Sequence, residues 1–410
     1  LPVWDSIREC FEKVEAMIAE DRVSAIWTLG YGGAAEGIAK MCFGNKIGFE
    51  FTTRVSGEKL YKPCYGGFVI ELSGEGRDGE DVIGKTIDEY KIRNIDYTIG
   101  LDNLQRAWEG KLEPVFPCRI KTTDATPETY SFAERMQLKA NTSVAQPKVL
   151  IPVFPGTNCE YDTERAFRRA GAKTETVVIR NLSASDIEES VKYFERAIRQ
   201  SQIIMIPGGF SGGDEPEGSG KFITAFFRNP RIKDAVHELL QKRDGLMLGI
   251  CNGFQALIKL GLVPFGEIVD MKDDSPTLTF NTIARHQSMM VNTRIASNKS
   301  PWLYGCEVGD IHAIPISHGE GRFTAPASLI QQLAKNGQIA TQYVDLDGNP
   351  TMDIRYNPNT SVEAIEGITS PDGRVLGKMG HSERLGGFIG KNVPGNKDQK
   401  IFESGVAYFK

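Results

Sequence analysis

The sequence predicts an α/β protein with a parallel sheet, preceded by a smaller α+β region. Three observations lead to this prediction. From Val149 onward, short apolar runs alternate with amphipathic helical patterns, as in βαβ units around a sheet covered on both faces. The 410 residues exceed the length of one ordinary domain. A polar stretch without sustained strand periodicity, residues 121–147, lies between the two regions and is predicted to be a linker.

The N-terminal region, residues 1–120, opens with a predicted helix over residues 4–20 whose apolar side chains share one face. The residues on this face are Ile7, Phe11, Val14 and Ile18. Gly-rich turns and strand-like runs such as residues 66–72 follow the helix. This mixture predicts an α+β unit.

The region 148–410 is predicted to be one domain. Short apolar runs predict strands at residues 149–154, 174–179, 202–209 and 245–250. Apolar residues at spacings of three and four predict helices at residues 161–172, 183–200, 229–244 and 252–262. Beyond Pro264 the chain becomes β-rich, with expected strands at 277–284, 312–317 and 338–344 and a hairpin around 370–373.

The composition argues against several classes of protein. The formal net charge is −5 and no long block of like charge occurs, so nucleic-acid binding is not expected. No apolar run approaches the roughly 18 residues of a membrane span, and no secretory signal is present. The seven cysteines include no CxxC pair, which argues against a disulfide framework and a cysteine-rich zinc site. We expect a cytoplasmic protein with reduced thiols and no metal.

The segment from Gly249 to Gly253 joins an expected buried strand to an expected helix. Cys251 at its centre takes the nucleophile position of a G-x-nucleophile-x-G elbow. The glycines remove Cβ atoms that would clash in such a turn, and the first N–H groups of the helix favour a thiolate. On residue type alone, a buried structural cysteine is the alternative. The strand–elbow–helix context favours the nucleophile.

A thiol nucleophile needs a base, and the chain has five histidines. Three of them have no context that indicates a role, and these are His237, His286 and His312. His318 and His381 each follow a strand-like run and precede a carboxylate by two residues, Glu320 and Glu383 respectively. In extended chain, such a spacing places both side chains on the same side. The spacing alone leaves both pairs open, and for either pair a surface salt bridge is the alternative.

A Gly-rich stretch, residues 207–220, follows the expected strand 202–209 and leads toward a helix. Its Gly208 and Gly209 can turn backbone N–H groups toward one point, as stabilisation of an oxyanion requires. A flexible loop is the alternative. A phosphate-binding loop is excluded, because G-x-x-x-x-G-K-[ST] is absent from this stretch.

Five motifs, taken in order, resemble those of one family. They read "IPVFPGTNCEYDTERAFRRAG", "IPGGFSGGDEPEGSG", "LGICNGFQALIKLGLVP", "PISHGEGRF" and "GKMGHSERLGG". Together they resemble the class I, or triad, glutamine amidotransferase domain at the C-terminus of large-type phosphoribosylformylglycinamidine synthases. The resemblance spans roughly residues 147–410 and implies a flavodoxin-like fold for the domain 148–410.

The resemblance implies that Cys251 is the nucleophile, that His381 is the general base and acid, and that Glu383 orients His381. It therefore favours His381 over His318. Members of this family usually read Pro-His-Pro-Glu-Arg around the histidine, whereas Gly380 and Ser382 replace the two prolines here. We expect a less rigid loop around the triad as a result.

The resemblance also implies the positions that surround the reacting carbon. Gly209 and Phe210, with the N–H of Asn252, resemble an oxyanion hole. The segment around His318 would line the glutamine pocket or contact the synthase part of the enzyme. These assignments come from the family and not from spacing.

Residues 1–120 resemble the C-terminal half of a synthetase-like domain related to aminoimidazole ribonucleotide synthetase, chiefly through "IWTLGYGGAAEGIAKMCFGNKIGFEF". Family members commonly read His-Asp-Val-Ser-Asp-Gly-Gly where this chain has residues 27–33. Thr28 stands where an Asp would bind Mg²⁺, and Gly30 stands where a Ser would contact a nucleotide. No cofactor-binding residue is therefore assigned. We expect this chain to be the C-terminal piece of a longer polypeptide.

The resemblance implies a glutaminase that supplies ammonia for the conversion of formylglycinamide ribonucleotide to the amidine, in purine biosynthesis. The glutaminase step would require no cofactor, and ATP and Mg²⁺ would be bound outside this chain. The expected partners are glutamine and the synthase portion of the same polypeptide, with no nucleic acid and no membrane. Two alternatives remain open, a cysteine hydrolase of the same fold unrelated to purines and a catalytically silent interaction module.

Overall fold

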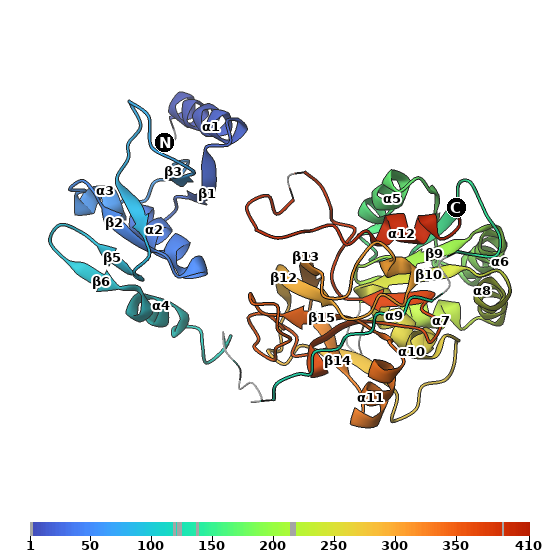
Figure 1. Cartoon of the computed structure of the whole chain (residues 1–410). Coiled ribbons are helices and arrows are strands. Elements are labelled where there is room, and N and C mark those ends of the chain that lie inside the picture. The colour runs from blue at the N-terminus through green and yellow to red at the C-terminus, as the bar shows by residue number, and fades with distance from the viewer. Residues whose placement is uncertain (1–2, 118–119, 121–124, 137–138, 214–218, 388) are drawn as a thin grey trace. The chain divides into compact units, whose positions relative to one another are not determined.

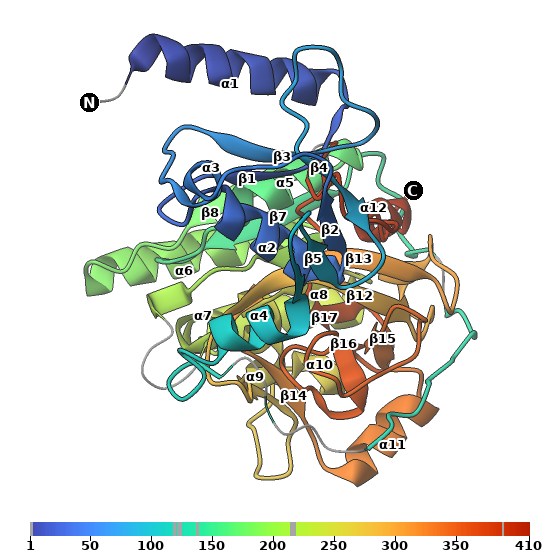
Figure 2. The same ribbon diagram turned by 90° about the vertical axis from the view of Figure 1, so that its left-hand side faces the viewer.

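The structure is a computed structural model that describes residues 3–117, 120, 125–136, 139–213, 219–387 and 389–410 (Figures 1 and 2). The chain divides into two compact units, Leu1–Cys118 and Arg119–Lys410. Among the described residues, no helix combines the length and the apolar character needed to cross a membrane.

The first unit is an α+β unit. It contains two small sheets, the antiparallel pair β1 (Val23–Thr28) and β3 (Phe68–Leu72), and a four-stranded sheet. The strand order of the second is β4 (Gly84–Ile87), β2 (Gly48–Phe51), β5 (Lys91–Arg93), β6 (Thr98–Gly100). The helices are α1 (Trp4–Ala19), α2 (Gly33–Asn45), α3 (Gly57–Tyr61) and α4 (Leu101–Glu109).

The predicted N-terminal helix is present as α1, but its apolar face is only partly covered. Val14 and Met17 are buried, whereas Phe11 and Ile18 are each 49% exposed. The core of this unit forms instead around α2, where Ile38 and Phe43 pack with Leu101.

The second unit is built on a nine-stranded sheet. Its strand order is β13 (Ile311–His318), β12 (Gln287–Ile295), β15 (Ile339–Val344), β16 (Ile365–Thr369), β17 (Val375–Lys378), β10 (Leu246–Ile250), β9 (Ile203–Ile206), β7 (Lys148–Val153), β8 (Lys173–Val178). The five strands from β17 to β8 are parallel, and four of them, β7, β8, β9 and β10, correspond to the predicted strands. The other four extend the sheet in antiparallel fashion. The sheet is therefore mixed, and the expected hairpin around residues 370–373 joins its two halves.

Helices cover the parallel half in two groups (Figure 1). In one group α6 (Ala184–Gln200) contacts α8 (Pro230–Lys242), and α7 (Lys221–Phe227) contacts both α8 and α9 (Asn252–Leu260). In the other, α5 (Glu160–Arg169) contacts α12 (Ile401–Ala407). The remaining elements are α10 (Leu262–Phe265), α11 (Ala327–Lys335) and the antiparallel pair β11 (Thr277–Phe280) and β14 (Glu320–Thr324).

The described parts of the expected linker, residues 125–136 and 139–147, run along the second unit. The N–H of Phe132 donates to the carbonyl of Ala296 at 2.9 Å, and that of Val144 donates to the carbonyl of Phe409 at 2.7 Å. The side chains of Tyr130 and Val144 pack against the main core. We call residues 125–136 and 139–147 the strap, because they are bound to the second unit by these contacts.

Candidate active site

The candidate site lies where four neighbouring parallel strands end. The strands β7, β9, β10 and β17 are adjacent in the sheet, and each leads into a loop at its carboxyl end. Sites in open α/β sheets form at such ends. The loops that converge there carry Cys159, Gly208, Cys251 and His381.

Cys251 occupies a strained corner between β10 and α9. Its φ of 53° and ψ of −108° lie outside the conformations that a residue with a Cβ normally adopts. A Cβ on Gly253 would lie 2.0 Å from the carbonyl oxygen of Ile206, so only glycine allows the strand and helix to approach this closely. The corner is the predicted elbow, and it presents the thiol at the start of α9.

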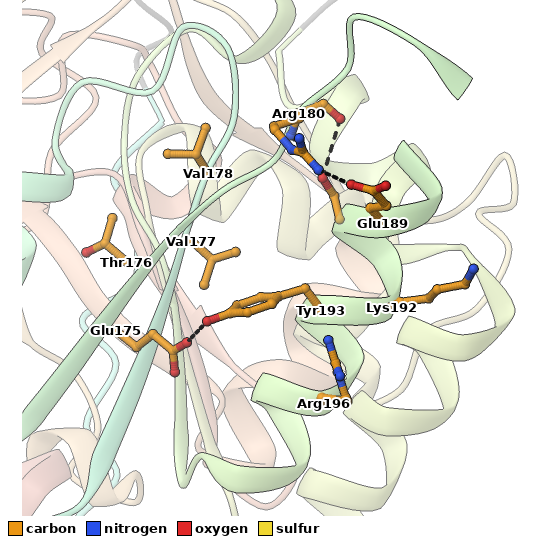
Figure 3. Close-up of a pocket in the computed structure, with 10 residues that line it drawn as sticks. Glu175, Thr176, Val177, Val178, Arg180, Glu189, Lys192, Tyr193 and Arg196 are labelled. Atoms are coloured by element: carbon orange, nitrogen blue, oxygen red, sulfur yellow. Dashed lines mark hydrogen bonds and ion pairs between the residues drawn. The ribbon is translucent and has the colours of Figure 1, made fainter. Parts of the chain in front are cut away.

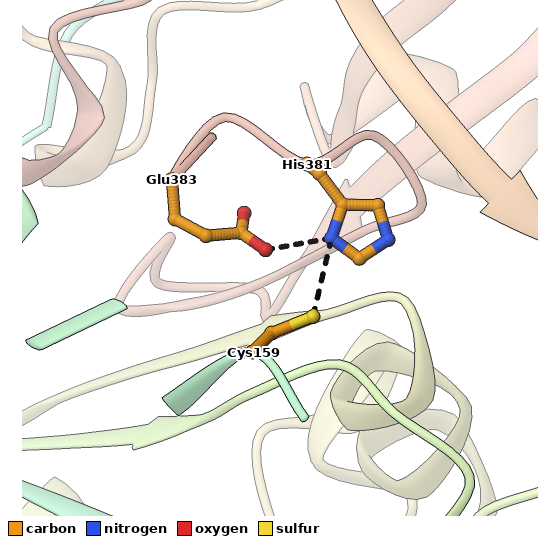
Figure 4. Close-up of side chains that lie close together, drawn as sticks. All are labelled: Cys159, His381 and Glu383. Carbon is orange, nitrogen blue, oxygen red and sulfur yellow. Dashed lines mark hydrogen bonds and ion pairs between the residues drawn. The ribbon is translucent and has the colours of Figure 1, made fainter. Parts of the chain in front are cut away.

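His381 and Glu383 form a buried pair in the loop after β17 (Figure 4). His381 Nδ1 and Glu383 Oε1 are 2.6 Å apart. Burial lowers the pKa of His381, but the carboxylate of Glu383 and the thiol of Cys251 raise that pKa more, to well above its usual range. Burial raises the pKa of Glu383, but the charge of His381 and their hydrogen bond lower it more. The arrangement therefore favours an imidazolium beside a carboxylate.

Cys251 and His381 flank the same point above Gly208. A Cβ on Gly208 would lie 2.8 Å from His381 Cε1 and 3.4 Å from Cys251 Cβ. His381 Nε2 is buried and has no hydrogen-bond partner among the described residues. Because Nδ1 is held by Glu383, Nε2 is the nitrogen that can exchange a proton with a thiol or a leaving group.

Cys159 is a second thiol at this site, which sequence reasoning missed. Its Sγ lies 3.9 Å from His381 Nδ1 and 3.4 Å from Arg384 Nη2, and it donates to Asn158 Oδ1 at 3.1 Å (Figure 4). Cys159 precedes α5 in the loop after β7, and only the sheet order brings it beside residues that lie far along the chain. The "NCE" triplet offered no signal that points to His381.

Cys159, His381 and Glu383 are residue types that can bind a metal ion, and their ligand atoms all lie within 4.8 Å of one another. A nitrogen and an oxygen on one zinc ion would be about 3.4 Å apart, given metal–ligand distances near 2.1 Å and tetrahedral angles. The observed 2.6 Å is instead the length of a charge-assisted hydrogen bond. The cluster therefore fits a proton-transfer site better than a metal centre.

The predicted oxyanion donors Gly209, Phe210 and Asn252 differ in the contacts that their residues make. Gly209 has a φ of 143°, and a Cβ there would lie 2.7 Å from the carbonyl oxygen of Gly156. The N–H of Phe210 donates to that carbonyl at 2.8 Å, so in this arrangement it does not point to a substrate. Asn252 begins α9 next to Cys251, and its Oδ1 accepts from the N–H of Ser211 at 3.2 Å. Phe210 is therefore not an oxyanion donor in this arrangement, and the donor role of Gly209 and Asn252 stays a prediction.

His318 lies at the end of β13 and is fully enclosed. Burial, followed by the charges of His381 and His286, lowers the pKa of His318 to about 3, so its ring is neutral near pH 7. Neither ring nitrogen has a hydrogen-bond partner among the described residues. Unlike Glu383, Glu320 accepts from a backbone N–H, that of Ser219 at 2.9 Å. The structure therefore pairs His381 with its glutamate, and it does not pair His318 with Glu320.

The other three histidines lie outside this cluster of side chains. His237 Nε2 accepts from the N–H of Ile268 at 3.0 Å, which is a structural role. His286 Nε2 lies 3.0 Å from Ser317 Oγ, and His312 is buried in β13.

A separate groove of about 520 Å³ lies between β8 and α6 (Figure 3). Two pairs of polar side chains meet in it. Tyr193 donates to Glu175 at 2.8 Å, and Arg180 pairs with Glu189. None of the predicted site residues lines it, so the groove is separate from the candidate site.

Comparisons with known proteins bear on this site. Residues 146–409 match the family described as the CobB/CobQ-like glutamine amidotransferase domain. The chain is 37% identical over 239 residues to the phosphoribosylformylglycinamidine synthase subunit PurQ of Methanococcus maripaludis, covering 58% of this chain and 82% of that protein. It is 33% identical over 237 residues to the same subunit of Aquifex aeolicus, covering 58% of this chain and 90% of that protein.

A solved structure, that of PurLQS from Thermotoga maritima, is similar to 65% of this chain and 100% of its own, with a TM-score of 0.47 and 25% identity. The family match covers more than half of the chain and contains every residue of the candidate site. The chain therefore belongs to the CobB/CobQ-like glutamine amidotransferase family, together with the PurQ subunits of phosphoribosylformylglycinamidine synthase.

Proposed function

We propose that this chain is the glutaminase part of a phosphoribosylformylglycinamidine synthase and that it releases ammonia from glutamine for purine biosynthesis. Membership of the amidotransferase family and the names of its relatives support the class of reaction. One observation carries the assignment of residues, the buried His381–Glu383 pair beside the strained Cys251 corner. An activated thiol, a base and an orienting carboxylate are the three groups that acyl transfer requires.

In the first half of the reaction, the Cys251 thiolate attacks the side-chain amide carbon of glutamine and forms a carbon–sulfur bond. The N–H groups of Gly209 and Asn252 stabilise the oxygen that becomes negative. The imidazolium of His381 gives its Nε2 proton to the amide nitrogen. The carbon–nitrogen bond then breaks, ammonia leaves, and a γ-glutamyl thioester remains on Cys251.

In the second half, neutral His381 takes a proton from water through Nε2, and the water oxygen bonds to the thioester carbon. The carbon–sulfur bond breaks and releases glutamate and the Cys251 thiolate. The proton held by His381 restores the imidazolium that began the cycle. Glu383 keeps its carboxylate charge throughout and holds the ring by Nδ1.

This cycle requires no cofactor. In the complete enzyme ATP and Mg²⁺ would activate the ammonia acceptor. Residues 27–33, at the end of β1, contain no carboxylate. The nearest one in sequence, Glu36, accepts from the N–H of Gly32 and from Lys40. These residues do not fit a site for Mg²⁺, and we assign the ATP chemistry to a synthase portion that acts as partner of this chain.

The test is hydrolysis of glutamine by Cys251→Ala beside the unchanged chain. The variant should form no glutamate, and a glutamine-like electrophile should label the unchanged chain at Cys251 unless glutamine is present. In the complete synthase, the same substitution should remove the use of glutamine and leave synthesis from ammonia intact. Glutamate formation by Cys251→Ala would refute the assignment, and labelling that glutamine does not block would favour another cysteine hydrolase.

A further inference from the structure

A network of buried polar side chains lies directly beneath the loop that carries His381 and Glu383. Its centre is Lys378, the last residue of β17, whose side chain is 1% exposed. Its Nζ donates to the carbonyl of Gly380 at 2.7 Å and to Ser382 Oγ at 3.0 Å, and it lies 3.2 Å from Glu366 Oε1. These three partners account for all three N–H groups of an ammonium.

Glu366 extends the network into the neighbouring strand β16. Its side chain is fully buried, and Oε1 accepts from the N–H of Gly380 at 2.6 Å. Its Oε2 accepts from the hydroxyl of Thr341 in β15. Both carboxylate oxygens therefore have partners, and the charge is balanced by Lys378. A buried ion pair that is fully hydrogen-bonded fixes geometry even where it contributes little net stability.

Ser382 links the network to Gln399 and, through it, to Thr293. Its Oγ accepts from Lys378 and donates to Gln399 Oε1 at 2.6 Å, while Gln399 Nε2 donates to Thr293 Oγ1 at 3.2 Å. Between Gly380 and Ser382, the N–H of His381 itself donates to the carbonyl of Pro315 at 2.8 Å. Each of these three consecutive residues is thus tied to the body of the domain.

The network occupies the two positions where the family usually has prolines. Gly380 uses an N–H that proline lacks, and a Cβ there would lie 2.8 Å from Ile314 Cγ2 and 3.0 Å from Lys378 Nζ. Ser382 uses a hydroxyl. Gly380 and Ser382, which stand in place of the two prolines and led us to expect a less rigid loop, are therefore the residues through which the network holds that loop.

We propose that Lys378, Glu366, Ser382 and Gln399 are positioning residues that hold His381 and Glu383 in register with Cys251. The same strand end serves the nucleophile, because the carbonyl of Lys378 accepts from the N–H of Cys251 at 2.9 Å. One lysine thus fixes the elbow through its backbone and the triad loop through its side chain. This proposal rests on the proposed glutaminase function.

The variant that tests it is Ser382→Ala, since it removes the link without leaving an unpaired buried charge. The matched control is Ser404→Ala, a hydroxyl of similar burial that also both donates and accepts, with Lys400 and Gly305. We expect kcat for glutamine to fall roughly 10- to 100-fold in Ser382→Ala, with KM within about two-fold, because misplacement by a fraction of an ångström affects the reaction more than binding. The control should keep the kcat of the unchanged chain.

A second readout needs no turnover. The rate at which iodoacetamide alkylates Cys251, followed by mass spectrometry of its peptide against pH, reports the thiolate that His381 stabilises. The midpoint of the alkylation rate against pH should move to higher pH in Ser382→Ala and should not change in Ser404→Ala. The double variant Lys378→Met with Glu366→Gln, which removes both charges together, should show the same changes, and a larger fall in kcat.

The outcomes separate the two proposals. If the unchanged chain forms no glutamate, the proposed function fails, and the alkylation profile still tests the positioning. If Ser382→Ala and the double variant remain folded and keep both the kcat and the alkylation midpoint of the unchanged chain, the network is only structural and the positioning proposal is wrong.

Discussion

At the catalytic corner, the charges of two buried residues depend on each other. The pKa of His381 lies well above its usual range, where the carboxylate of Glu383 and the thiol of Cys251 outweigh the lowering effect of burial. Burial raises the pKa of Glu383, but the charge of His381 and the hydrogen bond between them lower that pKa more. Neither residue would keep its charge alone in this enclosed place. The pair therefore acts as one unit.

Replacing Glu383 by Gln should separate these effects. Without the carboxylate, burial dominates, so the pKa of His381 falls and the ring loses its fixed orientation. We expect kcat to fall by about 10²- to 10⁴-fold, as when the acidic member of a triad becomes an amide. The midpoint of Cys251 alkylation should move to higher pH. An exposed glutamate in α12, Glu403→Gln, is the control, and a Glu383→Gln enzyme with normal kcat would contradict the triad.

His318 predicts a dependence of stability on pH. Burial, with the charges of His381 and His286, lowers its pKa in the folded chain to about 3, whereas an unfolded histidine titrates near 6.5. Between these values the unfolded chain binds a proton that the folded chain does not. Stability therefore falls as pH falls, by up to about 1.4 kcal/mol per pH unit from this residue.

Urea unfolding of His318→Gln between pH 6.5 and 4 measures this contribution. The free energy of unfolding should fall less steeply with decreasing pH in the variant than in the unchanged chain. His286→Gln removes an exposed histidine whose charge lowers the pKa of His318 less than burial and His381 do, so the slope should change much less than in His318→Gln. Equal slopes in all three proteins would mean that His318 is protonated in the fold.

At the scale of elements, the site depends on glycine where strand ends and loops crowd together. Gly208 follows β9 and has His381, Cys159 and Cys251 around the place where a Cβ would stand, at 2.8, 3.2 and 3.4 Å. The first of these distances is shorter than a carbon–carbon contact allows, and the atom that the Cβ would meet, Cε1 of His381, belongs to a buried ring. A methyl group here would push the ring of His381 away from Cys251.

Gly208→Ala should therefore lower kcat by more than about ten-fold, given the steep dependence of such reactions on position. Gly387→Ala is the control, since a Cβ there meets nothing within 4 Å. Glutamine hydrolysis and thermal unfolding of both variants check the prediction. If Gly208→Ala is as active as the control, His381 has room to move, and the crowding does not matter for catalysis.

The parallel strands, the helices and the elbow could be predicted because local pattern determines them. The apolar runs that form β7, β9 and β10 are buried, and Ser183 and Asn229 cap α6 and α8 where the sequence placed their starts. The strand β12 had no such signal. Its Arg294 donates to the carbonyl of Tyr130 at 2.7 Å, a contact between distant parts of the chain.

Within the site, too, only groups of residues that lie close together in the sequence could be predicted. Cys251 and its glycines form one local motif, and His381 with Glu383 form another. Cys159 and Glu366 reach the site through strand order, and the sequence pattern of β17 gave no reason to expect that Lys378 is buried. Reactive side chains within one short motif can therefore be predicted from the sequence, whereas the side chains that other strands bring beside them depend on the order of strands in the sheet.

At the scale of the whole chain, the strap ties residues that precede the family match to the domain. Gln342 in β15 is fully buried and makes three hydrogen bonds. Its Oε1 accepts from the N–H of Tyr130 at 3.0 Å, and its Nε2 donates to the carbonyls of Glu128 and Glu363 at 2.8 and 2.9 Å. Tyr130 also packs against the main core. One amide side chain thus fastens the strap to the sheet.

Gln342→Ala should release this end of the strap. The variant leaves one N–H and two carbonyls, all partly buried, without their partner, and an unsatisfied group that stays away from water costs about 1–3 kcal/mol. We expect the free energy of unfolding of the second unit to fall by about 2–4 kcal/mol and proteases to cut within residues 125–136 more rapidly. The exposed Gln332→Ala in α11 is the control. The side chain of Gln342 forms these hydrogen bonds with Glu128, Tyr130 and Glu363 and not with a candidate-site residue, so kcat at low temperature should stay normal. A large loss of kcat without faster cleavage would show that the strap acts on the site rather than on the fold.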